Sequence, residues 1–150
     1  MQTRINNALK TAMIDKDRLR TSTLRLVIAA IKEREICLRS EDDNPVLDED
    51  AVIQLLSKMV KQRQDSATAY TDAGRDDLAK REKAEIKIIR EFMPKPLSED
   101  EVAEAVRAAI VSVDASSIKD MGKVMGALKA RYTGRMDFGK AGAAVKSALI

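Results

Sequence analysis

Histidine and tryptophan are absent from this chain of 150 residues, and cysteine occurs only once, as Cys37. The lack of histidine excludes Ser–His and Cys–His nucleophilic pairs, and one cysteine cannot replace the missing ligands of the common zinc sites. We therefore expect no catalytic residue, no metal and no cofactor. A single cysteine also excludes an internal disulfide, and its position between Ile36 and Leu38 predicts a structural thiol.

Aromatic residues make up only 3% of the chain, and no segment alternates apolar and polar residues as a strand would. No apolar run reaches the ~18 residues that a membrane span needs, and the polar segment 1–17 lacks the apolar centre of a signal peptide. We expect an all-α protein in the cytoplasm, without membrane association.

Apolar residues recur at helical spacing along most of the chain. This pattern predicts helices over residues 3–14, 17–38, 49–73, 75–92, 99–113 and 116–132, with a short last helix near the C-terminus. Pro94 and Pro96 interrupt the pattern, because proline ends a helix and restricts the residue before it. The predicted architecture is a four-helix subdomain over residues 1–93, a linker over 94–98 and a three-helix tail domain over 99–150.

Residues that satisfy the free peptide groups at helix ends mark several of these boundaries. The expected caps are the N-caps Asp48 and Asp137, the terminal glycines Gly74 and Gly134, the capping box Ser98–Glu101 and the cap pair Ser117–Asp120. Acidic residues at 41–43 and 48–50 lack the spacing of an EF-hand, and they predict an acidic loop followed by a charged first helical turn.

Charge is distributed unevenly. Residues 116–150 contain seven Lys and Arg but only two Asp, a net charge of +5, whereas residues 1–115 have a net charge of −2. A nearly neutral body with a basic tail indicates an anionic partner for the tail.

The basic tail also contains Gly122 and Gly126 inside a predicted helix, where glycine costs about 1 kcal/mol relative to alanine. Seven cations accompany this pair: Lys119, Lys123, Lys129, Arg131, Arg135, Lys140 and Lys146. The glycines permit the close approach either of a phosphodiester backbone or of another helix packed tightly within the tail domain. Only Tyr132 and Phe138 are aromatic nearby, which favours recognition of the backbone and shape of a folded RNA over stacking with single strands.

A second basic feature lies in the predicted helix 17–38. Its members recur every seven residues and therefore share one side of the helix: Arg18, Arg25, Lys32 and Arg39. One interpretation is a docking face for RNA or for an acidic partner. The other is a solvated edge whose side chains extend over the core.

The stretch "SSIKDMGKVMGALKARYTGRMD", followed by "VKSAL", resembles the tail domain of the GatB/YqeY family. The stretches "KDRLRTSTLRLVIAAIKEREI", "KQRQDSATAYTDAGRDDLAKREKAEI" and "MPKPLSEDE" are similar to the free-standing, YqeY-like branch. The resemblance covers nearly the whole chain. Met136 and Phe138 depart from it, since smaller residues are more usual there.

The family resemblance implies a helical tail domain like that of the B subunit of the glutamine-dependent tRNA amidotransferase, where the tail helps to hold the tRNA. The positions that match are Gly122, Lys123, Val124, Met125, Gly126, Gly134, Arg135 and Asp137. By this resemblance Lys123 and Arg135 would contact phosphates, the glycines and Met125 would form a close-approach motif, and Asp137 would cap the last helix.

Three functions remain open on this basis. The first is an accessory module that binds tRNA or another folded RNA and performs no chemistry. The second is a helical adaptor that binds a protein, with a translation-related protein as candidate partner. The third is a carbon–nitrogen ligase that uses glutamine as amido donor, as the family label implies, although no amidase loop and no Gly-rich nucleotide loop is recognisable.

Overall fold

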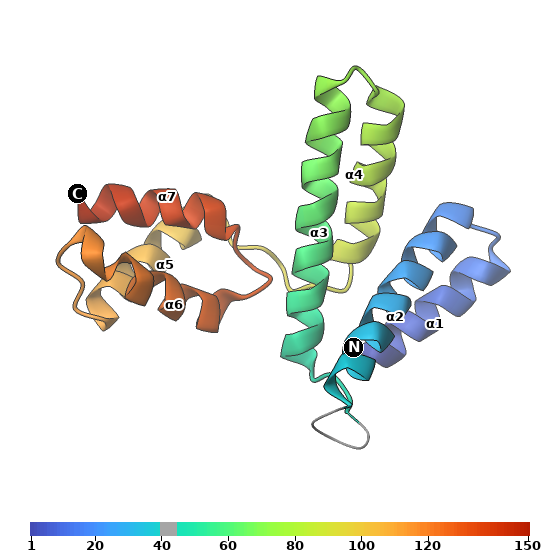
Figure 1. Ribbon diagram of the computed structural model, residues 1–150, viewed down its shortest axis with the longest axis horizontal. Coiled ribbons are helices and arrows are strands. Elements are labelled where there is room, and N and C mark those ends of the chain that lie inside the picture. Colours follow the sequence, from blue (N-terminus) through green and yellow to red (C-terminus); the bar gives the residue numbers. More distant parts are fainter. Residues whose placement is uncertain (40–44) are drawn as a thin grey trace. The chain divides into compact units, whose positions relative to one another are not determined.

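The computed structural model describes residues 1–39 and 45–150, and within these ranges every regular element is a helix (Figure 1). The elements are α1 (Gln2–Ile14), α2 (Arg18–Leu38), α3 (Glu49–Asp72), α4 (Asp76–Arg90), α5 (Glu99–Ser112), the 3-10 helix η1 (Ile118–Asp120), α6 (Met121–Tyr132) and α7 (Phe138–Leu149). The prediction of an all-α chain with seven helices is confirmed over the described ranges. The acidic loop expected at residues 41–43 lies outside the described residues.

Contacts between helices divide the chain into two compact units, Met1–Met93 and Pro94–Ile150. In the first unit α1 packs on α2 and α3 packs on α4, and α2 also contacts α3 and α4. Figure 1 shows α1 with α2, and α3 with α4, as two helical hairpins. The largest fully buried side chains of this unit are Ile5, Leu24, Leu56 and Ile89. Burial of such a side chain stabilises the fold by about 1.5–3 kcal/mol.

A buried ion pair joins α3 to α4 inside the first unit. Arg63 Nε donates to Glu85 Oε2 at 2.9 Å, and the two side chains are only 13% and 10% exposed. Arg81 Nε approaches the other Glu85 oxygen at 3.4 Å. Because both carboxylate oxygens have a cationic partner, Glu85 can be buried without an uncompensated charge.

The prediction of a structural thiol at Cys37 is wrong, because the Cys37 side chain is exposed. The buried face of α2 contains Leu24, Val27 and Ile31. Leu38 continues that face. Successive residues of an α-helix are about 100° apart around its axis, so Cys37 points away from the face that Leu38 continues. The preceding Ile36 is 62% exposed for the same reason.

The second unit packs α5, α6 and α7 against one another. The buried core of this unit includes Val106 of α5, Val124 and Leu128 of α6, and Ala141 and Val145 of α7. The three helices therefore share one small core to which each contributes a single face.

The helix predicted from residue 116 onward begins differently from the expectation, because its first turn is the 3-10 helix η1. The amide groups of Ser116 and Ser117 donate to Asp120 Oδ2 at 3.1 and 3.2 Å. The Asp120 amide donates to the Ser117 carbonyl at 3.0 Å, an i to i+3 bond that tightens the turn. Regular α-helix follows only from Met121.

Caps that depend on neighbouring residues are confirmed. The side chain of Asp48 accepts a hydrogen bond from the Ala51 amide at 2.8 Å, as an N-cap should. The other confirmed features are the capping box Ser98–Glu101, the N-cap Asp137, and the positive φ angles of Gly74 (74°) and Gly134 (79°). Helix ends were predictable because their chemistry is local in sequence.

Candidate nucleic-acid interface

Gly122 and Gly126 of α6 face open space. A Cβ atom added at either glycine would meet no heavy atom of the described residues within 4 Å, apart from the neighbouring backbone of α6 itself. The alternative in which these two glycines serve tight helix packing inside the tail is therefore wrong. Packing on α7 uses a different glycine, Gly142, which is buried and whose Cβ would lie 3.7 Å from the Met121 methyl carbon.

The glycine face of α6 is opposite to its core face. Val124 and Leu128 are fully buried, whereas Gly122, Gly126 and Lys129 are exposed. Residues at i, i+4 and i+7 lie along one side of a helix, so these three form a single outward row. We call this row, together with Lys123 of α6 and Lys119 of the preceding η1, the α6 face.

The lysines of the α6 face differ in their neighbours. Lys123 Nζ lies 3.6 Å from Asp120 Oδ1, and because the lysine side chain is exposed the pair contributes little to stability. Hydrogen bonds from the Ser116 and Ser117 amides, more than this lysine, lower the pKa of Asp120. Lys119 and Lys129 have no ion pair within the described part of the chain.

Arg135 has a structural role that local sequence does not indicate. Its Nε donates to the Lys95 carbonyl at 3.1 Å, and its own carbonyl accepts from the Leu97 amide at 2.8 Å. The turn after α6 is thereby attached to the segment that precedes α5. The phosphate contact expected of Arg135 stays a prediction.

The other candidate residues of the tail lie elsewhere. Arg131 is placed over the Tyr132 ring, 5.6 Å from its centroid. Lys140 and Lys146 are exposed on α7, but a separation of six residues places them about 120° apart around the helix. Met125 is partly buried and packs against the core of the second unit. Asp137 caps α7, where its side chain accepts from the Gly139 and Lys140 amides.

The basic stripe of α2 is exposed at all four positions, Arg18, Arg25, Lys32 and Arg39. The structure brings Arg18 and Arg25 together with Lys16 around one surface hollow. Lys16 was not predicted, because it lies in the turn between α1 and α2 and not on the helical stripe.

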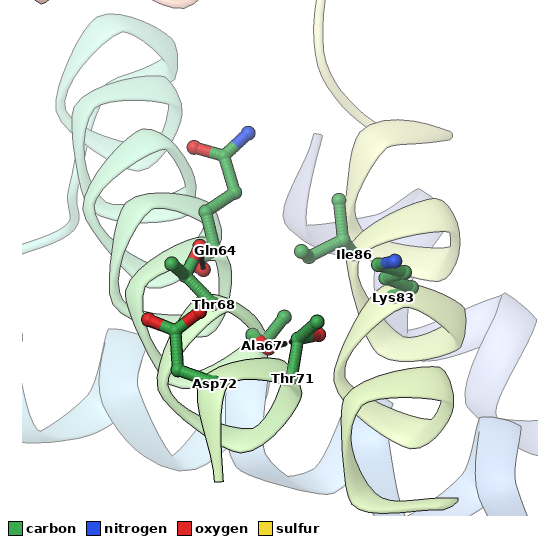
Figure 2. Close-up of a pocket in the computed structure, with 7 residues that line it drawn as sticks. All are labelled: Gln64, Ala67, Thr68, Thr71, Asp72, Lys83 and Ile86. Carbon is green, nitrogen blue, oxygen red and sulfur yellow. Dashed lines mark hydrogen bonds between the residues drawn. The ribbon is translucent and has the colours of Figure 1, made fainter. Parts of the chain in front are cut away.

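A second hollow, of about 310 Å³, lies between α3 and α4 (Figure 2). Figure 2 shows Lys83 and Ile86 on one wall and residues of α3, including Asp72, on the other. The Thr71 hydroxyl donates to the Ala67 carbonyl at 2.9 Å within α3. This hollow contains one cation and one carboxylate and so has no strong charge preference.

Within residues 1–39 and 45–150, no group of three or more His, Cys, Asp or Glu side chains is placed to hold a metal ion. None of the described helices is both long and apolar enough to cross a membrane. Every buried side-chain nitrogen and oxygen of the described part has a hydrogen-bond partner.

The fold and surface define a small helical protein with two compact units, one of which has an exposed glycine row flanked by lysines. The chain matches the family described as Yqey-like protein over residues 2–149, and it belongs to that family. The YqeY resemblance seen in the sequence is thus confirmed.

Curated relatives share the name "Altered inheritance of mitochondria protein 41, mitochondrial". The protein from Meyerozyma guilliermondii is 46% identical over 85 residues, which cover 57% of this chain and 42% of that protein. The protein from Lachancea thermotolerans is 42% identical over 85 residues, covering 57% and 43% of the two chains. A Saccharomyces cerevisiae protein is 36% identical over 85 residues, covering 57% and 44%. The matched stretch is thus less than half of each relative's length.

Proposed function

We propose that this chain is an accessory RNA-binding protein whose α6 face contacts the phosphate backbone of a folded RNA, with tRNA as the candidate. The observation that supports this proposal is the open glycine row, Gly122 and Gly126, between Lys119, Lys123 and Lys129. A helix surface without Cβ atoms lets a sugar–phosphate backbone come close, and the lysines supply the opposite charge. The protein performs no chemistry in this proposal.

The stability cost of the glycines supports a binding role. Each glycine in a helix interior costs about 1 kcal/mol relative to alanine. No packing contact within the described residues requires either of them to be glycine. A ligand that approaches α6 closely would account for their presence.

The number of lysines on the α6 face predicts how binding depends on salt. Three phosphate contacts, from Lys119, Lys123 and Lys129, give a slope of roughly −2 to −3 in a plot of log affinity against log salt concentration. Phosphate contacts of this kind position the protein without reading the base sequence.

The test is fluorescence anisotropy of a labelled tRNA transcript with the purified chain across a potassium chloride series. We expect the variant Lys119→Gln/Lys129→Gln to lose at least tenfold in affinity and to have a shallower salt slope. The control Lys80→Gln/Lys87→Gln removes two exposed lysines of α4 and should bind as wild type does. Binding that is absent at low salt, or equal losses in both variants, would contradict the proposal.

A helix of a partner protein is the second candidate for the α6 face, because small residues also permit two helices to pack closely. The open glycine row is the observation that favours it. Binding to such a partner would tolerate salt, whereas RNA binding would weaken as salt rises. Release of ammonia from glutamine by the pure chain would instead indicate the ligase activity of the family label.

The location of the protein stays a prediction. The names of the curated relatives refer those proteins to mitochondria, and the cytoplasmic location expected from the sequence gains no support from them.

A further inference from the structure

The first unit contains a basic hollow of about 510 Å³ at the turn between α1 and α2. Two helices and the turn contribute its walls: Met13, Lys16, Arg18, Thr21, Ser22 and Arg25. The turn is held by hydrogen bonds from the Lys16 amide to the Met13 carbonyl and from the Asp17 amide to the Ala12 carbonyl. Lys16 has a φ of +55°, an uncommon conformation for a residue with a Cβ. The hollow therefore has a defined backbone frame.

Three cations line this hollow, Lys16, Arg18 and Arg25, and none of its lining residues is acidic. None of the three forms an ion pair with any residue in the described ranges. The neighbouring Arg20 shows the contrast, since its guanidinium pairs with Glu91 at 2.8 Å and takes no part in the hollow. The pocket cations thus retain their full hydrogen-bonding capacity.

The acidic residues of this turn are not part of the lining of the hollow. The Asp17 carboxylate accepts the Arg20 amide as the N-cap of α2, and Asp17 does not line the hollow. Asp15 is exposed and does not line the hollow. The charged side chains that line the hollow are therefore all positive.

Two hydroxyl groups line the wall. Ser22 Oγ donates its hydrogen to the Leu19 carbonyl at 3.0 Å, so Ser22 has no hydroxyl hydrogen left for an anion. Thr21 is half-buried and lines the same hollow. Its hydroxyl can donate to an anion that the arginines hold.

We propose that this hollow binds a phosphate group. Arginine presents a planar fork of donors that matches phosphate oxygens in a bidentate arrangement, and lysine adds a point charge. Two arginines, one lysine and a threonine hydroxyl provide donors for a dianion carried by a larger molecule, since the hollow exceeds the size of a free phosphate. This site belongs to the Met1–Met93 unit, and it does not depend on the function proposed for α6.

The test is a titration of the ¹⁵N-labelled full chain with inorganic phosphate, at constant ionic strength maintained by potassium chloride. We expect saturable amide shifts centred on residues 16–25. The variant Arg18→Gln/Arg25→Gln should weaken phosphate binding at least tenfold. The control variant Lys10→Gln/Arg34→Gln removes the same charge from exposed positions of α1 and α2 outside the hollow, and it should bind as wild type does.

Three results would overturn the phosphate site: no saturable shift, shifts spread over all exposed cations, or equal weakening in both double variants. Thr21→Val provides a test that keeps every charge, and it should weaken phosphate binding several-fold without lowering helix content. If Thr21→Val and Arg18→Gln/Arg25→Gln, measured as separate variants, both bind phosphate as wild type does, the site is likewise contradicted.

A competition arm distinguishes the sources of the phosphate group. If poly(U) displaces inorganic phosphate from residues 16–25, the natural ligand is a polynucleotide backbone. If inorganic phosphate binds and poly(U) does not displace it, the ligand is a small phosphorylated molecule. Loss of RNA binding in the α6 variant with intact phosphate binding here would separate this site from the proposed function.

Discussion

Replacement of Gly126 by alanine should stabilise the protein. Gly126 is the sixth of the twelve residues of α6, and its φ is not positive. Apart from the neighbouring backbone of α6, the added Cβ would have no described atom within 4 Å. Alanine in a helix interior is favoured over glycine by about 1 kcal/mol, partly because it restricts the unfolded chain. We therefore expect the free energy of unfolding to rise by about that amount.

Urea unfolding followed by far-UV circular dichroism measures this change. A gain of about 1 kcal/mol raises the melting temperature of a small domain by about 4–8 °C. Gly134→Ala is the matched control, because Gly134 has a φ of +79° and alanine is strained there. The control should destabilise the protein by about 1 kcal/mol.

The same substitution should act on RNA binding in the opposite direction. If a phosphodiester backbone packs on the glycine row, Gly126→Ala lowers RNA affinity while it stabilises the free protein. A destabilised Gly126→Ala protein would refute the structural reasoning. A stabilised protein with unchanged RNA affinity would refute the close-approach interpretation alone.

Two other predictions concern the buried ion pair of the first unit and the loss of folding stability at acid pH. Glu85→Ala leaves Arg63 buried without its partner and should cost about 3 kcal/mol in urea unfolding, whereas Asp65→Ala, at an exposed pair, should cost about 0.5 kcal/mol or less. Equal effects would show that the Arg63 pair is not buried in solution. The Glu101 carboxylate accepts a hydrogen bond from the Ser98 amide, and this bond lowers the pKa of the carboxyl group. The contribution of Glu101 to stability is therefore full above about pH 4.3, the ordinary pKa of glutamate, and it is lost as the pH falls through the lower pKa of the folded state. Glu101→Gln keeps the capping box, since glutamine can also accept the Ser98 amide, and it should make the loss of stability in acid less steep. Glu99→Gln serves as the control. An unchanged dependence of stability on acid pH in Glu101→Gln would contradict the assignment of this loss to Glu101.

Local chemistry explains which parts of the structure were predictable. The Asp48 cap and the Ser98–Glu101 capping box use residues within three positions of each other, so their bonds can be inferred from sequence spacing. The positive φ of Gly74 follows from a glycine placed directly after a helical pattern. Helical periodicity identified the seven helices for the same reason.

Features that join distant residues were not predictable. Arg135 and Lys95 are 40 residues apart, and only the folded tail brings the guanidinium to that carbonyl. Arg63 and Glu85 meet because α3 and α4 form a hairpin. Cys37 was misjudged because its apolar neighbours indicate burial, whereas the side of α2 that packs on other helices excludes it.

The sequence by itself determined that the chain is helical, where most helices begin and end, and that positive charge gathers in its last 35 residues. Tertiary structure decided which side of each helix faces the core. That choice left Gly122 and Gly126 open to solvent, buried Gly142, and placed Lys16 beside Arg18 and Arg25. The physical reason is that periodicity defines a helix face locally, whereas exposure depends on which other helices cover it.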